Sequence, residues 1–231
     1  MAMALDSNIV GYTTKGVAAS QKLMSGAQFV EVGEAGLDLA SIKLENVSAA
    51  GGAFIQWWNG SSYDQAAWVE EVDDIANNIG WGDAGTWEAV TYTFEPGEGF
   101  WIVMPPGATG AKVTQSGEVA LSKAATYDFP VTASSKFMLI NPLPTELNLS
   151  DVTLTGVSAS GGASIQWWNG TSYEIAAWVD EVDDISNNLG WGDAGTWAAV
   201  THTFNPNEGF WILMPPGAPA PQVKIANKVL L

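Results

Sequence analysis

The chain has 231 residues, of which 47% are hydrophobic and 14% are charged, a balance that excludes a disordered chain and allows one large or two small domains. Eight Lys, no Arg and 25 acidic residues give a formal net charge of −17, which excludes nucleic-acid binding and disfavours an anionic membrane surface. The absence of Cys rules out disulfides, thiolate metal sites and cysteine nucleophiles, and no apolar run approaches the ~18 residues of a membrane span.

An internal repeat dominates the sequence. Residues 51–108 align without gaps with residues 161–218 at an offset of 110, and 46 of these 58 positions are identical. All 12 Trp lie in this block, six in each copy, at positions that do not differ. The period is far longer than the roughly 20–50 residues of solenoid repeats. We therefore predict two homologous domains, residues 1–121 and residues 122–231.

Apolar runs and turn residues predict mainly antiparallel β structure in each copy. Residues 53–58 are typical of a strand, and Asn59-Gly60 directly after them is a strong hairpin signal. Residues 91–94 and 99–104 are two further predicted strands, joined by a turn that contains Pro and Gly. The expected fold class is mainly β, with two tandem antiparallel domains that resemble a sandwich or a barrel.

Each domain is also predicted to contain one short acidic amphipathic helix. Four apolar residues stand at spacings of 4, 3 and 4, which places them on one helical face, while acidic and Asn residues fill the other face. A Gly follows in each copy as a natural C-terminal stop. The apolar residues are Trp68, Val72, Ile75 and Ile79 in the first copy, and Trp178, Val182, Ile185 and Leu189 in the second.

No constellation of catalytic residues is evident. The one His, His202, corresponds to Tyr92 in the first copy, so a Ser-His-Asp triad is impossible there. The sequence contains no phosphate-binding loop, dinucleotide fingerprint or nucleophile elbow. We therefore expect a protein that is not an enzyme.

A group of Asp and Asn residues is the candidate metal site. Hard oxygen ligands beside Gly-containing turns suit Ca²⁺, although the spacing differs from that of an EF-hand loop. The alternative is a polar helix face followed by an Asx turn, so the expected cofactor is none or calcium. The candidate ligands are Asp73, Asp74, Asn77 and Asp83 in the first copy, and Asp183, Asp184, Asn187 and Asp193 in the second.

The Trp-rich segments are the candidate ligand-binding site. Sugar rings stack on exposed indoles while polar side chains bind their hydroxyls. The alternative is core packing, because each buried Trp removes about 150–250 Å² from water. The candidate binding residues are Trp58, Asn59, Trp81, Trp87, Trp168, Asn169, Trp191 and Trp197.

Both ends of the sequence are short, apolar and strand-like. Either end could complete the open sheet edge of a neighbouring molecule by strand addition. The alternative is that both ends pair within their own domains. The candidate assembly residues are Ile9, Val10, Tyr12, Val229, Leu230 and Leu231.

Three motifs resemble a class of exported β-rich domains from bacteria of the Planctomycetes–Verrucomicrobia group. They are the SNIVGY start at residues 7–12, the Trp-Asn-Gly hairpin, and PGEGFW at residues 96–101; the second copy reads NPNEGFW at 205–211. The resemblance implies export and a cell-surface or extracellular setting, and it supplies no catalytic residues. The first residues lack the basic region and apolar core of a signal peptide, so either the chain is not exported by that route or the sequence begins at the mature terminus.

Together these observations predict a non-enzymatic exported or surface protein with a structural or adhesive role. Its partner would be a further copy of itself, in a lattice, a filament or a virion surface, or an extracellular polymer such as a glycan. The alternative is a bivalent carbohydrate-binding module, with or without calcium, in which two weak sites act together on one polymer.

Overall fold

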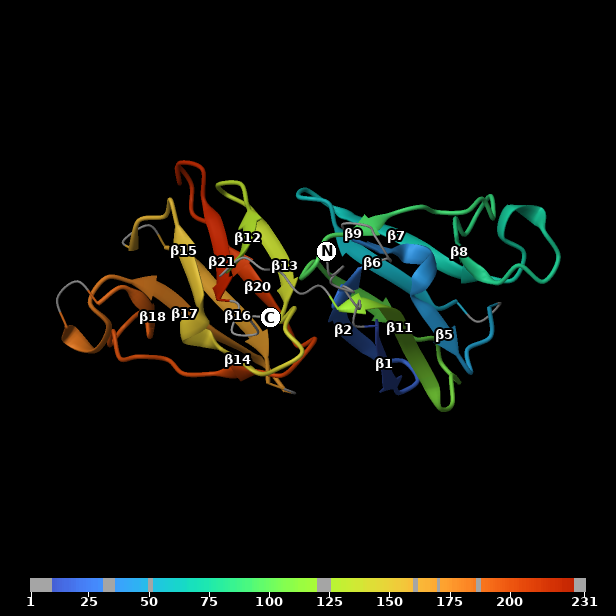
Figure 1. The fold of residues 1–231 in the computed structure, drawn as a ribbon, viewed down its shortest axis with the longest axis horizontal. Helices are drawn as coiled ribbons and strands as arrows, with labels where there is room; N and C mark the ends of the chain where they lie inside the picture. The colour runs from blue at the N-terminus through green and yellow to red at the C-terminus, as the bar shows by residue number, and fades with distance from the viewer. Residues whose placement is uncertain are drawn as a thin grey trace, which may run out of the picture. The chain divides into compact units, whose positions relative to one another are not determined.

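The computed structural model describes residues 10–30, 36–49, 52–119, 126–159, 162–169, 171–185 and 188–226. The chain forms two compact units (Figure 1): Met1–Trp57 with Asp64–Ala120, and Leu121–Leu231 with the hairpin end Trp58–Tyr63. The predicted domain boundary, between residues 121 and 122, lies outside the described residues.

Strands form nearly all the regular structure of the first repeat. They are β1 (Val10–Val17), β2 (Lys22–Gly26), β3 (Phe29–Val30), β4 (Leu37–Asp38), β5 (Lys43–Glu45), β6 (Phe54–Trp58), β7 (Tyr63–Val69), β8 (Gly80–Gly82), β9 (Thr93–Phe94), β10 (Gly99–Val103) and β11 (Ala111–Val119). The described part of this repeat adds only two 3₁₀ turns, η1 (Leu39–Ser41) and η2 (Val72–Asp74).

The second repeat follows the same plan. Its strands are β12 (Thr126–Pro130), β13 (Lys136–Ile140), β14 (Leu147–Asn148), β15 (Val152–Thr155), β16 (Ser164–Trp168), β17 (Tyr173–Val179), β18 (Gly190–Gly192), β19 (Thr203–Phe204), β20 (Gly209–Leu213) and β21 (Gln222–Ala226). It also contains the 3₁₀ turns η3 (Leu149–Asp151) and η5 (Val182–Asp184).

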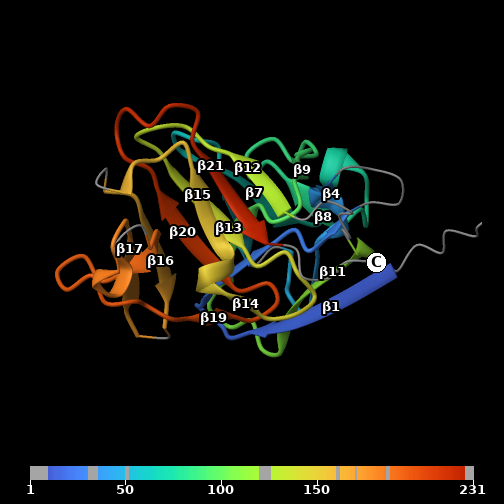
Figure 2. The same ribbon diagram turned by 60° about the vertical axis from the view of Figure 1, so that its left-hand side comes forward.

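The strands of each repeat are arranged in antiparallel sheets, which confirms the predicted mainly β fold. One sheet has five strands, in the order β2-β10-β6-β7-β8 in the first repeat and β13-β20-β16-β17-β18 in the second. A second sheet is built on β11, which pairs with β1, β3 and β5, or on β21, which pairs with β12 and β15 (Figure 2). The pairs β4-β9 and β14-β19 form a small third sheet.

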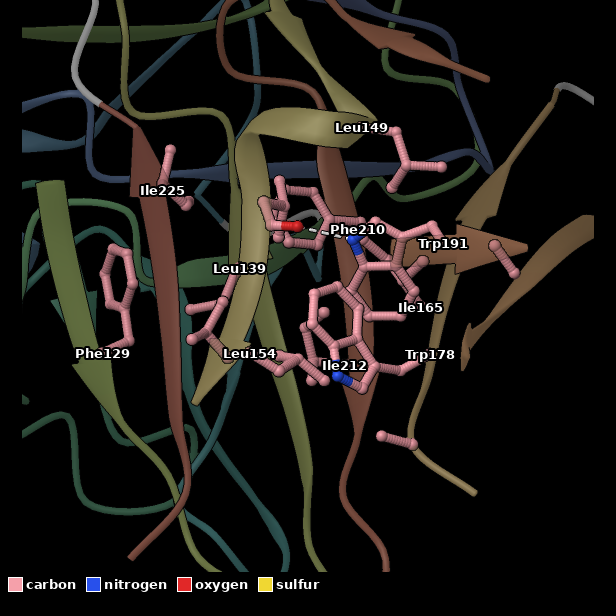
Figure 3. Close-up of a cluster of buried hydrophobic side chains, with 14 of the residues drawn as sticks. Phe129, Leu139, Leu149, Leu154, Ile165, Trp178, Trp191, Phe210, Ile212 and Ile225 are labelled. Atoms are coloured by element: carbon pink, nitrogen blue, oxygen red, sulfur yellow. Dashed lines mark hydrogen bonds between the residues drawn. The ribbon is translucent and has the colours of Figure 1, made fainter. Parts of the chain in front are cut away.

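The core of the second unit takes side chains from both of its larger sheets. Ile165 and Phe210 come from the five-stranded sheet, and Leu154 and Ile225 come from the three-stranded one (Figure 3). Alternate residues of β16 and β21 are buried, as expected where one face of a sheet packs on the core. This packed core holds the strands and the loops that connect them, and the candidate functional residues lie on those loops and at strand positions next to them.

The predicted amphipathic helix is wrong in both repeats. Trp68 lies in β7, opposite Trp81 of β8, and strand alternation alone directs its ring inward. Beyond β7 the chain makes only the turn η2, where Asp73 and Asp74 both have φ +57°. Two consecutive left-handed residues cannot continue a right-handed α-helix. The helical spacing was therefore a coincidence between a strand and the turn after it.

The second repeat departs from the prediction in the same way. Trp178 lies in β17 opposite Trp191, and Asp183 and Asp184 again have φ +57°. As a result, Ile185 and Leu189 are exposed and do not join a helical core face. No described helix in either repeat has the length and apolarity that would carry it through a membrane.

The first described residues pair within their own unit. Val10 stands opposite Glu118, and Tyr12 stands opposite Ser116, in the β1–β11 ladder. At this end of the chain, the pairing agrees with the alternative prediction, in which the chain ends pair within their own domains. Ile9 and the residues Val229, Leu230 and Leu231 lie outside the described residues.

Candidate functional site

Each unit exposes three large apolar side chains on the loops that flank β8 or β18. We call these sets the apolar loop surfaces. In the first unit Ile75, Ile79 and Trp87 are 57%, 50% and 44% exposed. In the second unit Ile185, Leu189 and Trp197 are 57%, 51% and 42% exposed. The two copies therefore hold the same surface to solvent to nearly the same extent.

Backbone hydrogen bonds tie the two loops of each surface together. In the first unit Asp73 N donates to Trp87 O at 2.8 Å, which joins the two loops, and Val72 N donates to Asn78 O at 2.9 Å, which closes the first loop on itself. The carboxylate oxygen Oδ1 of Asp73 accepts a further bond from Ala89 N at 2.7 Å. The loop that carries Ile75 and Ile79 is thus fastened to the loop that carries Trp87.

Trp87 is held in a strained backbone conformation. Its φ is +62°, and that of Trp197 is +60°. A left-handed residue other than Gly costs about 1–2 kcal/mol. Trp87 N donates to Asp83 O at 2.9 Å, so bonds on both sides of the residue maintain this conformation. A strained and exposed aromatic residue that occurs in both copies is a reason to look for a function at this position.

The carboxylate of Asp83 forms the turn just before Trp87. Its Oδ1 accepts bonds from Gly85 N and Thr86 N, both at 2.8 Å. These backbone N–H groups hold the pKa of the Asp83 carboxyl below its ordinary value. In the second unit the backbone N–H and the hydroxyl of Thr196 lower the pKa of Asp193 in the same way. The Asx turn expected at Asp83 is therefore present in both copies.

The structure does not gather the candidate metal ligands into one site. Oxygens of Asp73, Asp83 and their counterparts accept bonds from loop amides, as described above, and Asp74 and Asn77 have left-handed backbones. Among the residues that the structure describes, no group of three or more His, Asp and Glu could hold a metal ion. Asn187 lies outside those residues. Calcium binding remains a prediction.

Two of the candidate binding indoles belong to the core. Trp81 and Trp191 are both 4% exposed, and each stands edge-on to the facing Trp of the neighbouring strand. Trp81 Nε1 donates to Ile42 O at 2.7 Å, and Trp191 Nε1 donates to Val152 O at 2.6 Å (Figure 3). Neither ring offers a face on which a ligand could stack.

Apart from the apolar loop surfaces, the end of the β16–β17 hairpin carries an exposed pair of aromatic residues. Trp168 and Tyr173 stand opposite each other, with ring centroids 5.2 Å apart and an interplanar angle of 69°. Trp58 and Tyr63 form the same pair in the first repeat, also at 5.2 Å. Trp168 is exposed, whereas Trp58 is half-buried.

The hairpin Asn residues are occupied within their own turns. Asn59 Oδ1 accepts bonds from Ser61 N at 3.0 Å and Ser62 N at 2.9 Å. Asn169 Oδ1 makes the same bonds in the second copy, both at 2.9 Å. The amide oxygen of each Asn is thus committed to the turn.

Sequence reasoning missed the outward position of Ile75, Ile79 and their counterparts, because it assigned them to the buried face of a helix. The signal available in the sequence was the Asp-Asp pair between Val72 and Ile75. Asp and Asn are the residues that enter left-handed turns most readily after Gly. A turn at that pair would have separated Trp68 from the two Ile residues.

A half-buried polar pair differs between the copies. Tyr92 Oη donates to Glu98 Oε1 at 2.6 Å, whereas His202 Nε2 lies 3.1 Å from Glu208 Oε1. His202 also stacks on Trp167, with ring centroids 4.6 Å apart. Burial is the main cause that raises the pKa of the Glu98 carboxyl, while the bond from Tyr92 lowers it by less.

The raised pKa of Glu98 predicts a pH dependence of stability in the first unit. Because the folded state binds this proton more tightly than the unfolded state, the contribution of Glu98 is full below the ordinary value of 4.5 and is lost as the pH rises through the folded pKa. We expect Glu98→Gln to remove this loss. Urea denaturation from acid to neutral pH measures it, with the exposed Glu146→Gln as control. Parallel profiles for wild type and Glu98→Gln would contradict the assignment.

The Asp73 carboxylate predicts a local effect on the loop. Asp73→Ala removes the acceptor of Ala89 N and should cost about 1 kcal/mol. Asp74→Ala is a matched control, because Asp74 has the same φ of +57° and its carboxylate bonds to no described residue. Hydrogen exchange at the Ala89 amide should accelerate in the first variant only. Equal acceleration in both variants would show that the backbone change, and not the lost bond, is responsible.

Comparison with known proteins adds no assignment. A scan against protein-family models and searches of curated proteins and of solved structures found no match to this chain. The functional argument therefore depends on the geometry of the two units.

Proposed function

We propose that the protein is a non-enzymatic adhesion protein of the cell surface or extracellular space, in which each β unit presents one apolar loop surface to a partner. One observation carries the proposal. The three exposed side chains of the first unit and those of the second have almost equal exposure, position by position.

Exposed apolar side chains are common singly, but gathered sets of them mark interaction sites on soluble proteins. Here Trp87 is also held outward at the cost of a left-handed backbone. Ile79 is replaced only by Leu in the second copy, so the change keeps an aliphatic side chain at the exposed position. These features support binding over packing as the role of the two surfaces.

Two similar surfaces on one chain favour a polymeric or repeating partner. A second binding event on the same partner becomes intramolecular, so two weak sites hold a polymer far more tightly than one. Adhesion to an extracellular polymer and assembly with further copies of the chain both fit this description. Export, as the resemblance implies, would place the surfaces where such partners occur.

Carbohydrate binding is the second candidate function. The observation that favours it is the exposed indole of Trp87, which is repeated at Trp197 in the second unit. An exposed indole face can stack on a sugar ring while exposed carboxylates of the same loops, such as those of Asp74 and Glu88, accept bonds from the sugar's hydroxyls. Calcium would be an addition to this candidate and is not required by it.

The double variant Trp87→Ser, Trp197→Ser tests the proposal. Because both side chains are exposed, the fold should persist, as judged by circular dichroism and thermal unfolding. Binding to an immobilised panel of glycans and polypeptides should be lost. Ile175→Ser, which removes a different exposed apolar residue whose counterpart in the first copy is the polar Gln65, is the control. Retention of every panel interaction by the double variant would refute the proposal.

A further inference from the structure

Both apolar loop surfaces lie in acidic stretches of the chain. Residues 70–90 include six carboxylates and no Lys, Arg or His. Residues 180–200 include five carboxylates and again no basic residue. The carboxylates are Glu70, Glu71, Asp73, Asp74, Asp83 and Glu88 in the first copy, and Asp180, Glu181, Asp183, Asp184 and Asp193 in the second.

Some of these carboxylates serve the loop, and others remain available to a partner. Asp73 and Asp83 each accept bonds from loop amides. Glu71, Asp74 and Glu88 are exposed, and none of them forms an ion pair with a described residue. Their charge must therefore be balanced by solvent ions or by a cationic partner.

The combination of exposed indole, aliphatic side chains and unbalanced carboxylates matches one partner chemistry. An ammonium or guanidinium group within about 6 Å of an indole face is attracted by the ring. The long aliphatic stems of Lys and Arg pack on apolar side chains such as Ile75 and Ile79 while their charges reach nearby carboxylates. A neutral sugar would use the indole and leave the charges unmatched, and an anionic polymer would be repelled.

We propose that each apolar loop surface binds a cationic polypeptide segment rich in Lys or Arg, two segments per chain. This inference rests on the proposed adhesive function and names the chemistry of its partner. The argument depends on the charge complementarity of surfaces that the chain presents twice, with the same types of exposed apolar residue and an acidic surrounding in both copies.

Isothermal titration of the full chain with a short synthetic peptide of alternating Arg and Leu tests the proposal. Both peptide ends are blocked, and the ionic strength is kept near the physiological value so that weak long-range attraction is screened. The double variant Trp87→Ser, Trp197→Ser keeps every charge and should lower the affinity roughly a hundredfold, because the ring's attraction for the cation and its apolar contact are both lost. The double variant Glu71→Gln, Glu181→Gln should lower it and flatten its salt dependence, whereas Glu146→Gln and Ile175→Ser should leave it unchanged.

Equal affinity in wild type and the double Trp variant would overturn the inference, because it would reduce binding to general attraction by the acidic chain. A neutral oligosaccharide titrated in parallel distinguishes failure of the cationic-peptide inference from failure of the proposed adhesive function. If the sugar binds through Trp87 and Trp197 and the peptide does not, the inference fails and the adhesive function stands. If neither ligand depends on these residues, both fail.

Discussion

Replacing Trp197 alone by Ser should weaken attachment to a surface coated densely with ligand by about 10²–10⁴-fold, because the chain then has one binding surface in place of two. Trp87→Ser should have an effect of similar size, since the two indoles differ little in exposure and backbone conformation. For a small ligand that cannot bridge the two surfaces, the wild type should bind two ligand molecules per chain and each single variant should bind one.

Biosensor measurements at high and low ligand density separate these cases. The density-dependent loss of avidity should disappear when the ligands are too sparse to be bridged. A single variant that loses no more avidity than the control Ile175→Ser would show that the two surfaces do not act together. A loss confined to one of the two variants would show that the copies have diverged in function.

Replacing Trp81 by Ala should have the second large effect, a loss of about 3–5 kcal/mol in the free energy of unfolding. The ring is buried against Trp68, and its Nε1 donates to Ile42 O at 2.7 Å. Trp81→Phe keeps most of the apolar volume but leaves that carbonyl oxygen without this donor, so about 1–3 kcal/mol should be lost. Trp191→Phe, which removes the donor of Val152 O, is the equivalent change in the second unit.

Trp87 is the matched control for this prediction, because it lies a few residues from Trp81 in the chain and is exposed. Trp87→Ala should change stability by no more than about 0.5 kcal/mol. Trp87→Gly should stabilise the loop by up to about 1 kcal/mol, because Gly adopts a left-handed backbone without the cost borne by Trp. Urea denaturation followed by circular dichroism measures all five variants. A Trp87→Ala loss as large as that of Trp81→Ala would contradict the assigned burial.

The contrast between Trp81 and Trp87 shows where sequence reasoning reaches its limit. Both positions are invariant between the copies, so the repeat alone could not separate a core indole from a surface one. The distinction depends on strand pairing, because β8 places Trp81 opposite Trp68, and on the turn at Asp83 that directs the chain outward at Trp87. Neither the strand pairing nor the turn conformation can be read from the apolar character of an individual residue.

Local signals with a single structural meaning were reliable. Asn59-Gly60 forms the predicted hairpin turn, where Asn59 N donates to Ser62 O at 3.0 Å and Gly60 has φ +98°. The expected strands at 91–94 and 99–104 correspond to β9 and β10. Helical spacing from Trp68 to Ile79 misled because strand alternation followed by a left-handed Asp-Asp turn produces the same arrangement of apolar residues.

Radical footprinting with mass spectrometry tests the central claim most directly, since it reads the exposure of every Trp in one sample of the wild-type chain. The account predicts that Trp87 and Trp197 are oxidised at similar rates, that Trp81 and Trp191 are spared, and that a bound partner protects Trp87 and Trp197 together. Slow oxidation of Trp87 and Trp197 in the free protein, or equal oxidation with and without the bound partner, would contradict it.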